Sequence, residues 1–169
     1  AVGLGPARGE AAVERRSEQV VVARHGGVAW THVGHVEPDA AAQGVYNRSQ
    51  SAFASMRRTL ETAGVGFDRV VRTWLYLGGI VDNDGEVQRY KELNRARTDF
   101  YGDIPFGAGR TPPGWNKPFY PASTGIGTGG KDITMSCIAL ATDRPDVTCV
   151  PLENPQQTAA CEYAHQYGP

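Results

Sequence analysis

The stretch at residues 45–77, VYNRSQSAFASMRRTLETAGVGFDRVVRTWLYL, predicts a helix that is followed directly by a strand. Its apolar residues first recur at steps of three and four, which is the period of one face of a helix. Gly64 stands just after the last of them, where helices commonly end. Residues 69–77 are rich in valine and aromatic residues and show no helical period, so we expect a strand there. The expected apolar stripe of the helix consists of Val45, Ala52, Phe53, Met56, Leu60 and Ala63.

Before this stretch, the sequence predicts a β-hairpin. Residues 19–24 and 28–36 are rich in β-branched residues, and the turn His25-Gly26-Gly27 separates them. Asp39 follows the hairpin and is placed to cap the first helix.

After the stretch, the sequence predicts a second helix and two more strands. Asp84 is placed to cap the helix, and Gly102 to end it. The two strands are expected at residues 119–127 and 132–142, joined by a turn at residues 128–131. One side of the second helix is expected to carry Tyr90, Leu93, Arg97 and Phe100.

This order of elements predicts an α+β fold, a mixed β-sheet with two helices on one face. Two helices in 169 residues cannot cover both faces of the sheet, so we expect the bare face to be buried by self-association. We divide the chain into a flexible N-terminal arm at residues 1–17, a domain at residues 18–142 and a C-terminal tail at residues 143–169. The tail is expected to pack on the domain, with a possible strand at residues 158–163.

Composition excludes several classes of function. The 17 basic and 18 acidic residues nearly cancel, so there is no basic excess to bind nucleic acid. No apolar run approaches the roughly 20 residues that cross a membrane, and no secretory signal is apparent at the N-terminus. The three cysteines lack CxxC spacing, and His32 and His35 are expected on opposite faces of a strand, so we expect no metal and no cofactor. A cytoplasmic protein with reduced thiols is the expectation.

The irregular segment at residues 103–118 is the first candidate for function, because a structureless stretch of this length is usually functional or mobile. Arg110 and Lys117 flank Trp115 there, and cations of this kind bind small carboxylates. The alternative is that both cations are solvated loop charges. Tyr120 can add a hydroxyl contact, although packing is the usual role of such a tyrosine.

Several strings, in this order, resemble the Rid (YjgF-like) superfamily of reactive-intermediate deaminases over residues 18–142. They are GVAW at residues 27–30, LETAG at 60–64 followed by FDRVV at 67–71, YPA at 120–122, and ITMSCIA at 133–139. The resemblance implies a Rid- or chorismate-mutase-like fold. It also implies a homotrimer whose sheets form a central β-barrel, with ligand sites in the clefts between subunits.

A narrower resemblance is to the C-terminal half of chorismatases, carried by YPASTGIGT at residues 120–128, LENPQQ at 152–157 and YGP at 167–169. These enzymes hydrolyse the enolpyruvyl ether of chorismate in secondary metabolism. The resemblance implies metal-free hydrolysis or lysis of a small cyclic carboxylate, an enol ether or an enamine. Catalytic roles are expected for Ser136, which would orient water, and Glu162, a candidate general acid. Substrate contacts are expected from Arg110, Trp115, Lys117, Tyr120, Ser123, Thr124 and Gly125.

Two departures argue against a standard imine deaminase. Ser123 stands where those enzymes carry an arginine that binds the substrate carboxylate, and Ser136 stands where they carry an acid. Losing a positioned acid or base typically lowers a rate by about 10²- to 10⁴-fold. A non-catalytic metabolite-binding protein and an atypical imine or enamine deaminase are therefore the alternatives to a chorismatase-like enzyme. Gly125 and Gly127 would let a ligand or a neighbouring chain approach the backbone closely. The alternative is structural, because glycines in a strand also allow the sheet to bend.

Overall fold

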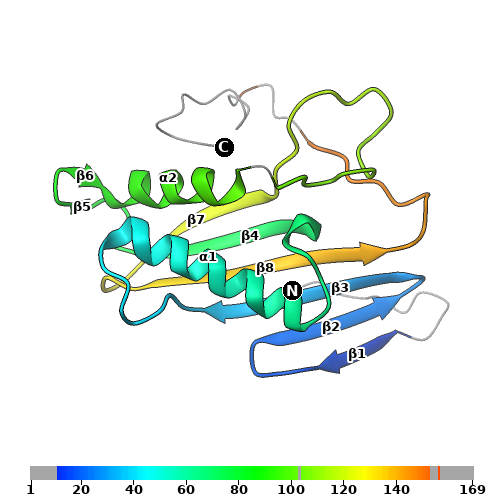
Figure 1. Cartoon of the computed structure of the whole chain (residues 1–169), viewed down its shortest axis with the longest axis horizontal. Helices are drawn as coiled ribbons and strands as arrows, with labels where there is room; N and C mark the ends of the chain where they lie inside the picture. The colour runs from blue at the N-terminus through cyan, green and yellow to red at the C-terminus, as the bar shows by residue number, and fades with distance from the viewer. Residues whose placement is uncertain (1–10, 103, 153–155, 157–169) are drawn as a thin grey trace.

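The computed structural model describes residues 11–102, 104–152 and 156 and shows one six-stranded mixed sheet with two helices on one face. Figure 1 shows α1 and α2 side by side in front of the sheet, as the sequence predicts. The elements are β1 (Ala12–Arg15), β2 (Val20–His25), β3 (Val28–Val36), α1 (Gly44–Thr62), the short helix η1 (Phe67–Arg69), β4 (Val70–Gly78), β5 (Asn83–Asp84), β6 (Val87–Gln88), α2 (Arg89–Tyr101), β7 (Ala122–Thr128) and β8 (Ile133–Thr142).

The strands lie in the order β1-β2-β3-β8-β4-β7. Strand β8 runs antiparallel to both β3 and β4, whereas β7 runs parallel to β4. The two last strands are therefore consecutive in the chain but not neighbours, because β4 lies between them. This arrangement makes β7 an edge strand and places its residues beside those of β4.

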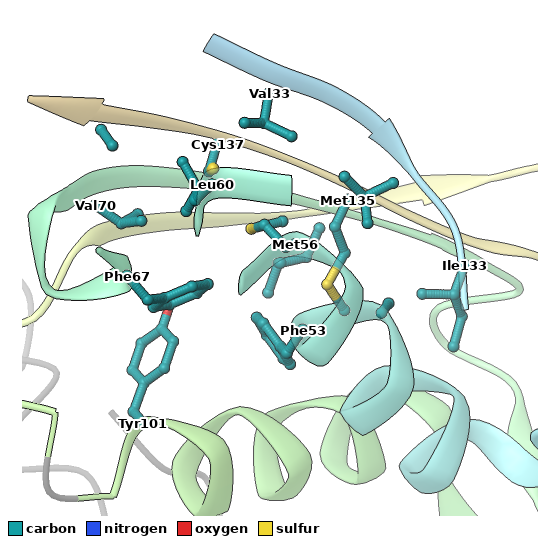
Figure 2. Packing of buried hydrophobic residues seen from close by; sticks show 14 of the residues in the cluster. Val33, Phe53, Met56, Leu60, Phe67, Val70, Tyr101, Ile133, Met135 and Cys137 are labelled. Carbon is teal, nitrogen blue, oxygen red and sulfur yellow. The ribbon is translucent and has the colours of Figure 1, made fainter. Parts of the chain in front are cut away.

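The core lies between the helices and the sheet. Phe53, Met56 and Leu60, from the predicted stripe of α1, are fully buried. They pack toward Met135 and Cys137 of β8, as Figure 2 shows. The predicted face of the first helix is therefore confirmed, and burying such side chains contributes roughly 1.5 to 3 kcal/mol each.

The predicted helix caps are wrong in both cases. Helix α1 begins at Gly44, and the Asp39 carboxylate instead accepts a hydrogen bond of 2.8 Å from the N–H of Ala41, in the turn before the helix. Asp84 lies in the β5–β6 hairpin, and its carboxylate accepts a 2.8 Å hydrogen bond from the N–H of Val45. Asp84 thus caps the first helix, because the hairpin that precedes α2 folds back onto the start of α1.

The expectation of a loose arm is wrong for Ala12–Arg15, which forms strand β1 antiparallel to β2. All four residues are exposed, so the segment has no apolar alternation by which the sequence would reveal a strand. Pairing satisfies backbone N–H and C=O groups that the edge of β2 would otherwise leave open. The expected strand at residues 158–163 lies outside the described residues. No helix in the described part of the chain is long and apolar enough to span a membrane.

Candidate functional site

The alternation of β4 separates two faces of the sheet. Thr73 and Leu75 are buried under the helices, whereas Arg72, Trp74 and Tyr76 point to the opposite side. We call the side that carries the helices the helix face and the other side the open face. Residues in register on neighbouring strands share a face, so this alternation also places the candidate residues of β7 and β8.

The predicted site residues are divided between these faces. Thr124 of β7 and Ser136 of β8 both pair with Trp74 and therefore lie on the open face. Ser123 and Gly125 pair with Thr73 and Leu75 and lie on the helix face. A single ligand pocket containing all four residues is therefore not formed within one domain.

An arginine that the sequence analysis did not select lies at the centre of the open-face group. Arg72 Nη2 donates a hydrogen bond of 2.7 Å to Oγ1 of Thr124. Its guanidinium carbon is 5.2 Å from the ring centroid of Trp74, a distance at which a cation and an aromatic ring attract. Among the described residues no carboxylate forms an ion pair with Arg72. The alternation of residues 70–77 contained the signal, since it puts Arg72 and Trp74 on the same side.

Hydroxyl groups flank this arginine on the open face. Register places Thr124, Trp74 and Ser136 in one row across β7, β4 and β8. Ser136 is half-buried, so its hydroxyl is accessible to a ligand or a water molecule. A guanidinium bonded to one hydroxyl, with an indole and the Ser136 hydroxyl in the next row, has donors that suit a carboxylate on a small ring.

The rest of the open face is mainly apolar. In the described strands its charged residues are Arg72 and Arg15, and no aspartate or glutamate is in register with them. His32 pairs with Ile138 on this face. Burial lowers its pKa, which favours the neutral imidazole. Other open-face side chains are Val21, Trp30, Tyr76, Ile126, Ile138 and Leu140.

The helix-face candidates make packing contacts. Thr73 Oγ1 and Ser123 Oγ are 3.0 Å apart and form a hydrogen bond. A Cβ atom on Gly125 would lie 2.6 Å from the ring of Tyr90 in α2, so close packing of the helix requires glycine there. Tyr120 stacks on Tyr101, with ring centroids 6.3 Å apart.

The loop cations have other contacts. Arg110 donates to the backbone carbonyls of Arg144, Thr142 and Val147, and its own carbonyl accepts a hydrogen bond from the N–H of Cys149. The Arg110 guanidinium therefore holds the segment after β8 in place, and backbone carbonyls occupy the donors that an anion would need.

Trp115, the aromatic residue between the two loop cations, is half-buried, and its indole nitrogen lacks a hydrogen-bond partner among the described residues. Lys117 Nζ lies 6.0 Å from the ring centroid of Trp115. Glu162, the expected general acid, lies outside the described residues.

Two further observations concern reactive groups. Burial raises the pKa of Cys137 to about 12, so its thiolate is scarce at neutral pH. The described part of the chain contains no cluster of three histidine, cysteine, aspartate or glutamate residues that could hold a metal ion.

Comparison with known proteins identifies the family. The sequence model of "Chorismatase FkbO/Hyg5-like, N-terminal" matches residues 7–141. The chain belongs to this family of chorismatase N-terminal domains. It is also 28% identical over 122 residues to a 3-hydroxybenzoate synthase of Streptomyces hygroscopicus, covering 72% of this chain and 32% of that protein. The chain thus spans about a third of the length of this relative.

Solved structures confirm the fold. A crystal structure of a chorismatase superposes with a TM-score of 0.56 at 20% identity, over 95% of this chain and 42% of that one. Yeast Mmf1 superposes with a TM-score of 0.51 at 12% identity, over 75% of this chain and 87% of that one. The resemblance to chorismatases is therefore confirmed, with one correction. The matching family model describes the N-terminal domain, whereas the strings at residues 120–128 and 152–157 suggested the C-terminal half.

Proposed function

We propose that this chain is a domain of a chorismatase-like enzyme of secondary metabolism that binds a small cyclic carboxylate on its open face. The observation that carries the proposal is the placement of Arg72, which is held by Thr124 and Trp74 and has no carboxylate partner among the described residues. Family membership supports a chorismate-like ligand.

Binding would use the arginine for charge and the neighbouring groups for orientation. A guanidinium can hold a carboxylate through two parallel hydrogen bonds. The indole of Trp74 offers an apolar surface to a six-membered ring, and Thr124 keeps the guanidinium in place. One charged hydrogen bond contributes roughly 1.5 to 3 kcal/mol, or about 10- to 150-fold in affinity.

The proposed reaction is hydrolysis of an enol ether. Water adds to the carbon that bears the ether oxygen after a proton has been delivered to the neighbouring methylene carbon. The hemiketal that results then collapses: the bond from the ether oxygen to the three-carbon fragment breaks, and the hemiketal hydroxyl loses its proton. The ring keeps the ether oxygen as an alcohol, and the fragment is released as pyruvate. In this proposal Ser136 would orient the water. The proton would come from a general acid that is not on the described strands of the open face, and Glu162 is our candidate.

The open face needs a cover before it can work as a cleft. Its apolar side chains favour burial, and water must be excluded for a charged contact to be strong. We propose that copies of this domain supply the cover as a homotrimer with a central β-barrel, with a ligand cleft at each subunit boundary. Light scattering is the test of this assembly, and a stable monomer at micromolar concentration would contradict it.

A non-catalytic binding protein is the second candidate. It is favoured by one observation: among the described strands, the open face carries no carboxylate that could act as an acid. An atypical imine or enamine deaminase is less well supported, because Ser123 is turned to the helix face and bonded to Thr73.

The experiment that separates these candidates measures pyruvate release from chorismate with a coupled dehydrogenase. The enzyme hypothesis predicts release by the wild type and a loss of at least 10-fold in Arg72→Met and Ser136→Ala. The control is Arg57→Met, because Arg57 also lies over an aromatic ring, 4.4 Å from the centroid of Phe100, but on the helix side. Chorismate binding without pyruvate release supports the binding protein, and neither binding nor release contradicts both.

A further inference from the structure

Helix α2 carries a buried arginine, Arg97, whose Nε–H group has no acceptor among the described residues. Arg97 is 9% exposed, and no described residue accepts a hydrogen bond from its buried Nε atom. No described carboxylate forms an ion pair with it. Burying a charge is strongly unfavourable unless it is paired, so this position is incomplete without an anion.

A second buried arginine on the same helix shows the contrast. Arg89 is 6% exposed, but its Nε donates 2.9 Å to the carbonyl of Gly78, and its Nη2 donates 2.8 Å to the carbonyl of Lys131. The fold therefore satisfies a buried guanidinium on α2 through backbone carbonyls where the guanidinium has only a structural role. In the described part of the chain, the Nε atom of Arg97 has no such acceptor.

Asn94, three residues before Arg97, is also left unsatisfied. It is 4% exposed, and its buried Oδ1 atom accepts no hydrogen bond from a described residue. Residues three apart on a helix share a face, with Cβ atoms about 5 to 6 Å from each other. Arg97 therefore needs an anionic acceptor, and the Asn94 amide beside it needs a donor.

Tyr101 adds a third polar group to this side of the helix. Its hydroxyl is buried beside the Thr73 side chain and makes no hydrogen bond of full geometry to a described residue. Burial raises the pKa of this phenol, while the Thr73 side chain and, less strongly, the charge of Arg97 act in the opposite direction. Tyr101 thus stays neutral and cannot serve as the missing anion.

We propose that Arg97 and Asn94 form a binding site for a small hydroxy-carboxylate, separate from the Arg72 site. The carboxylate would accept hydrogen bonds from the Arg97 guanidinium, and the hydroxyl would donate to Oδ1 of Asn94. Arg97 lies on the helix side of the sheet and Arg72 on the open face, so this site does not rest on the proposed function. A carboxylate side chain of the protein would satisfy Arg97 by the same chemistry, and the test must distinguish that source.

The test is calorimetric titration with 3-hydroxybenzoate and with benzoate, together with thermal unfolding. The variants are compared in an Arg72→Met background, which removes the open-face site, and there we expect Arg97→Met to weaken the binding of both probes by about 10- to 100-fold. Arg95→Met is the matched control, since Arg95 lies on the same helix but is exposed and paired with Glu92, and it should bind as the wild type does. The wild type should prefer 3-hydroxybenzoate to benzoate, and Asn94→Leu should remove that preference.

Stability without ligand gives an independent reading. Because Arg97→Met removes an unpaired buried charge, the ligand-free variant should unfold at the same temperature as the wild type or higher. If the methionine variant does not fold, Arg97→Lys keeps the charge and should still bind more weakly, because it lacks the planar fork of donors.

Two results would overturn the proposal. Binding lost in Arg72→Met but retained in Arg97→Met would place the ligand on the open face, which leaves the proposed function intact. A wild type that ignores both probes, with Arg97→Met unfolding at a lower temperature, would show that a carboxylate of the protein already occupies the site.

Discussion

The Nη2 atom of Arg72 lies 2.7 Å from Oγ1 of Thr124, which links two parallel strands at the edge of the sheet. The bond fixes a cation on a mainly apolar face. In the proposed site, Thr124 takes part through this bond, whereas its two chain neighbours face the other side of the sheet. The first prediction tests this role.

Thr124→Val removes the hydroxyl but preserves the shape of the side chain. The account predicts a loss of about 2- to 10-fold in affinity for a cyclic carboxylate, because one neutral hydrogen bond that orients Arg72 is lost. Calorimetry with 3-hydroxybenzoate provides the measurement. Thr128→Val, at the exposed end of the same strand, is the control and should leave affinity unchanged.

Asp84→Ala should destabilise the fold by about 1 kcal/mol, in the range of 0.5 to 2 kcal/mol observed for lost helix caps. The carboxylate of Asp84 is the acceptor for the N–H of Val45 at the start of α1. Urea unfolding measures the change, and Glu86→Ala, at an exposed position of the same hairpin, should change the free energy of unfolding by less than about 0.5 kcal/mol. Equal stability of the two variants would show that Asp84 is not a cap.

Cys137 should resist alkylation in the folded protein. With a pKa of about 12, roughly one thiol in 10⁴ is ionised at pH 8, and burial also blocks the reagent. Peptide mass spectrometry after iodoacetamide treatment is the measurement, with urea-unfolded protein as the positive control. Rapid modification under native conditions would contradict the burial of this strand.

The raised pKa of Cys137 also predicts how the free energy of unfolding changes with pH. Burial keeps the Cys137 thiol protonated in the folded state, whereas in the unfolded chain it ionises near pH 9. The part of the free energy of unfolding that depends on this thiol is therefore fully present below pH 9 and is lost as the pH rises toward 12.

Arg110→Met should release the segment that follows β8. The guanidinium donates to the carbonyl of Thr142 at the end of β8 and to the carbonyls of Arg144 and Val147 in that segment. We expect faster amide hydrogen exchange at residues 142–149, with no change in carboxylate affinity. A large loss of affinity with unchanged exchange would instead restore Arg110 as an anion anchor.

The sequence predicted the main elements because their signals are local. The stripe that contains Phe53 and Met56 recurs at helical spacing, and residues 28–36 appear as the predicted strand. The caps failed because capping by Asp84 is a long-range contact, 39 residues from Val45. Strand β1 was missed because its four residues are exposed on both sides.

The candidate site was predicted only in part, for a similar reason. Thr124 and Ser136 were chosen from strings, and the strand register brings them to either side of Trp74. Arg72 was not chosen, because its importance depends on a neighbour 52 residues away. The contacts of Arg110 could not be predicted either, because its acceptors are backbone carbonyls, which every residue type carries.

The most direct test of the open-face site is an NMR titration that follows the indole N–H signals of Trp74 and Trp115 with 3-hydroxybenzoate. The account predicts that the Trp74 signal shifts and saturates at submillimolar ligand, and that this shift is absent in Arg72→Met. Trp115 belongs to the loop at residues 103–118, so its signal should remain in place. A Trp115 shift with an unmoved Trp74 would contradict the account and return the site to the loop.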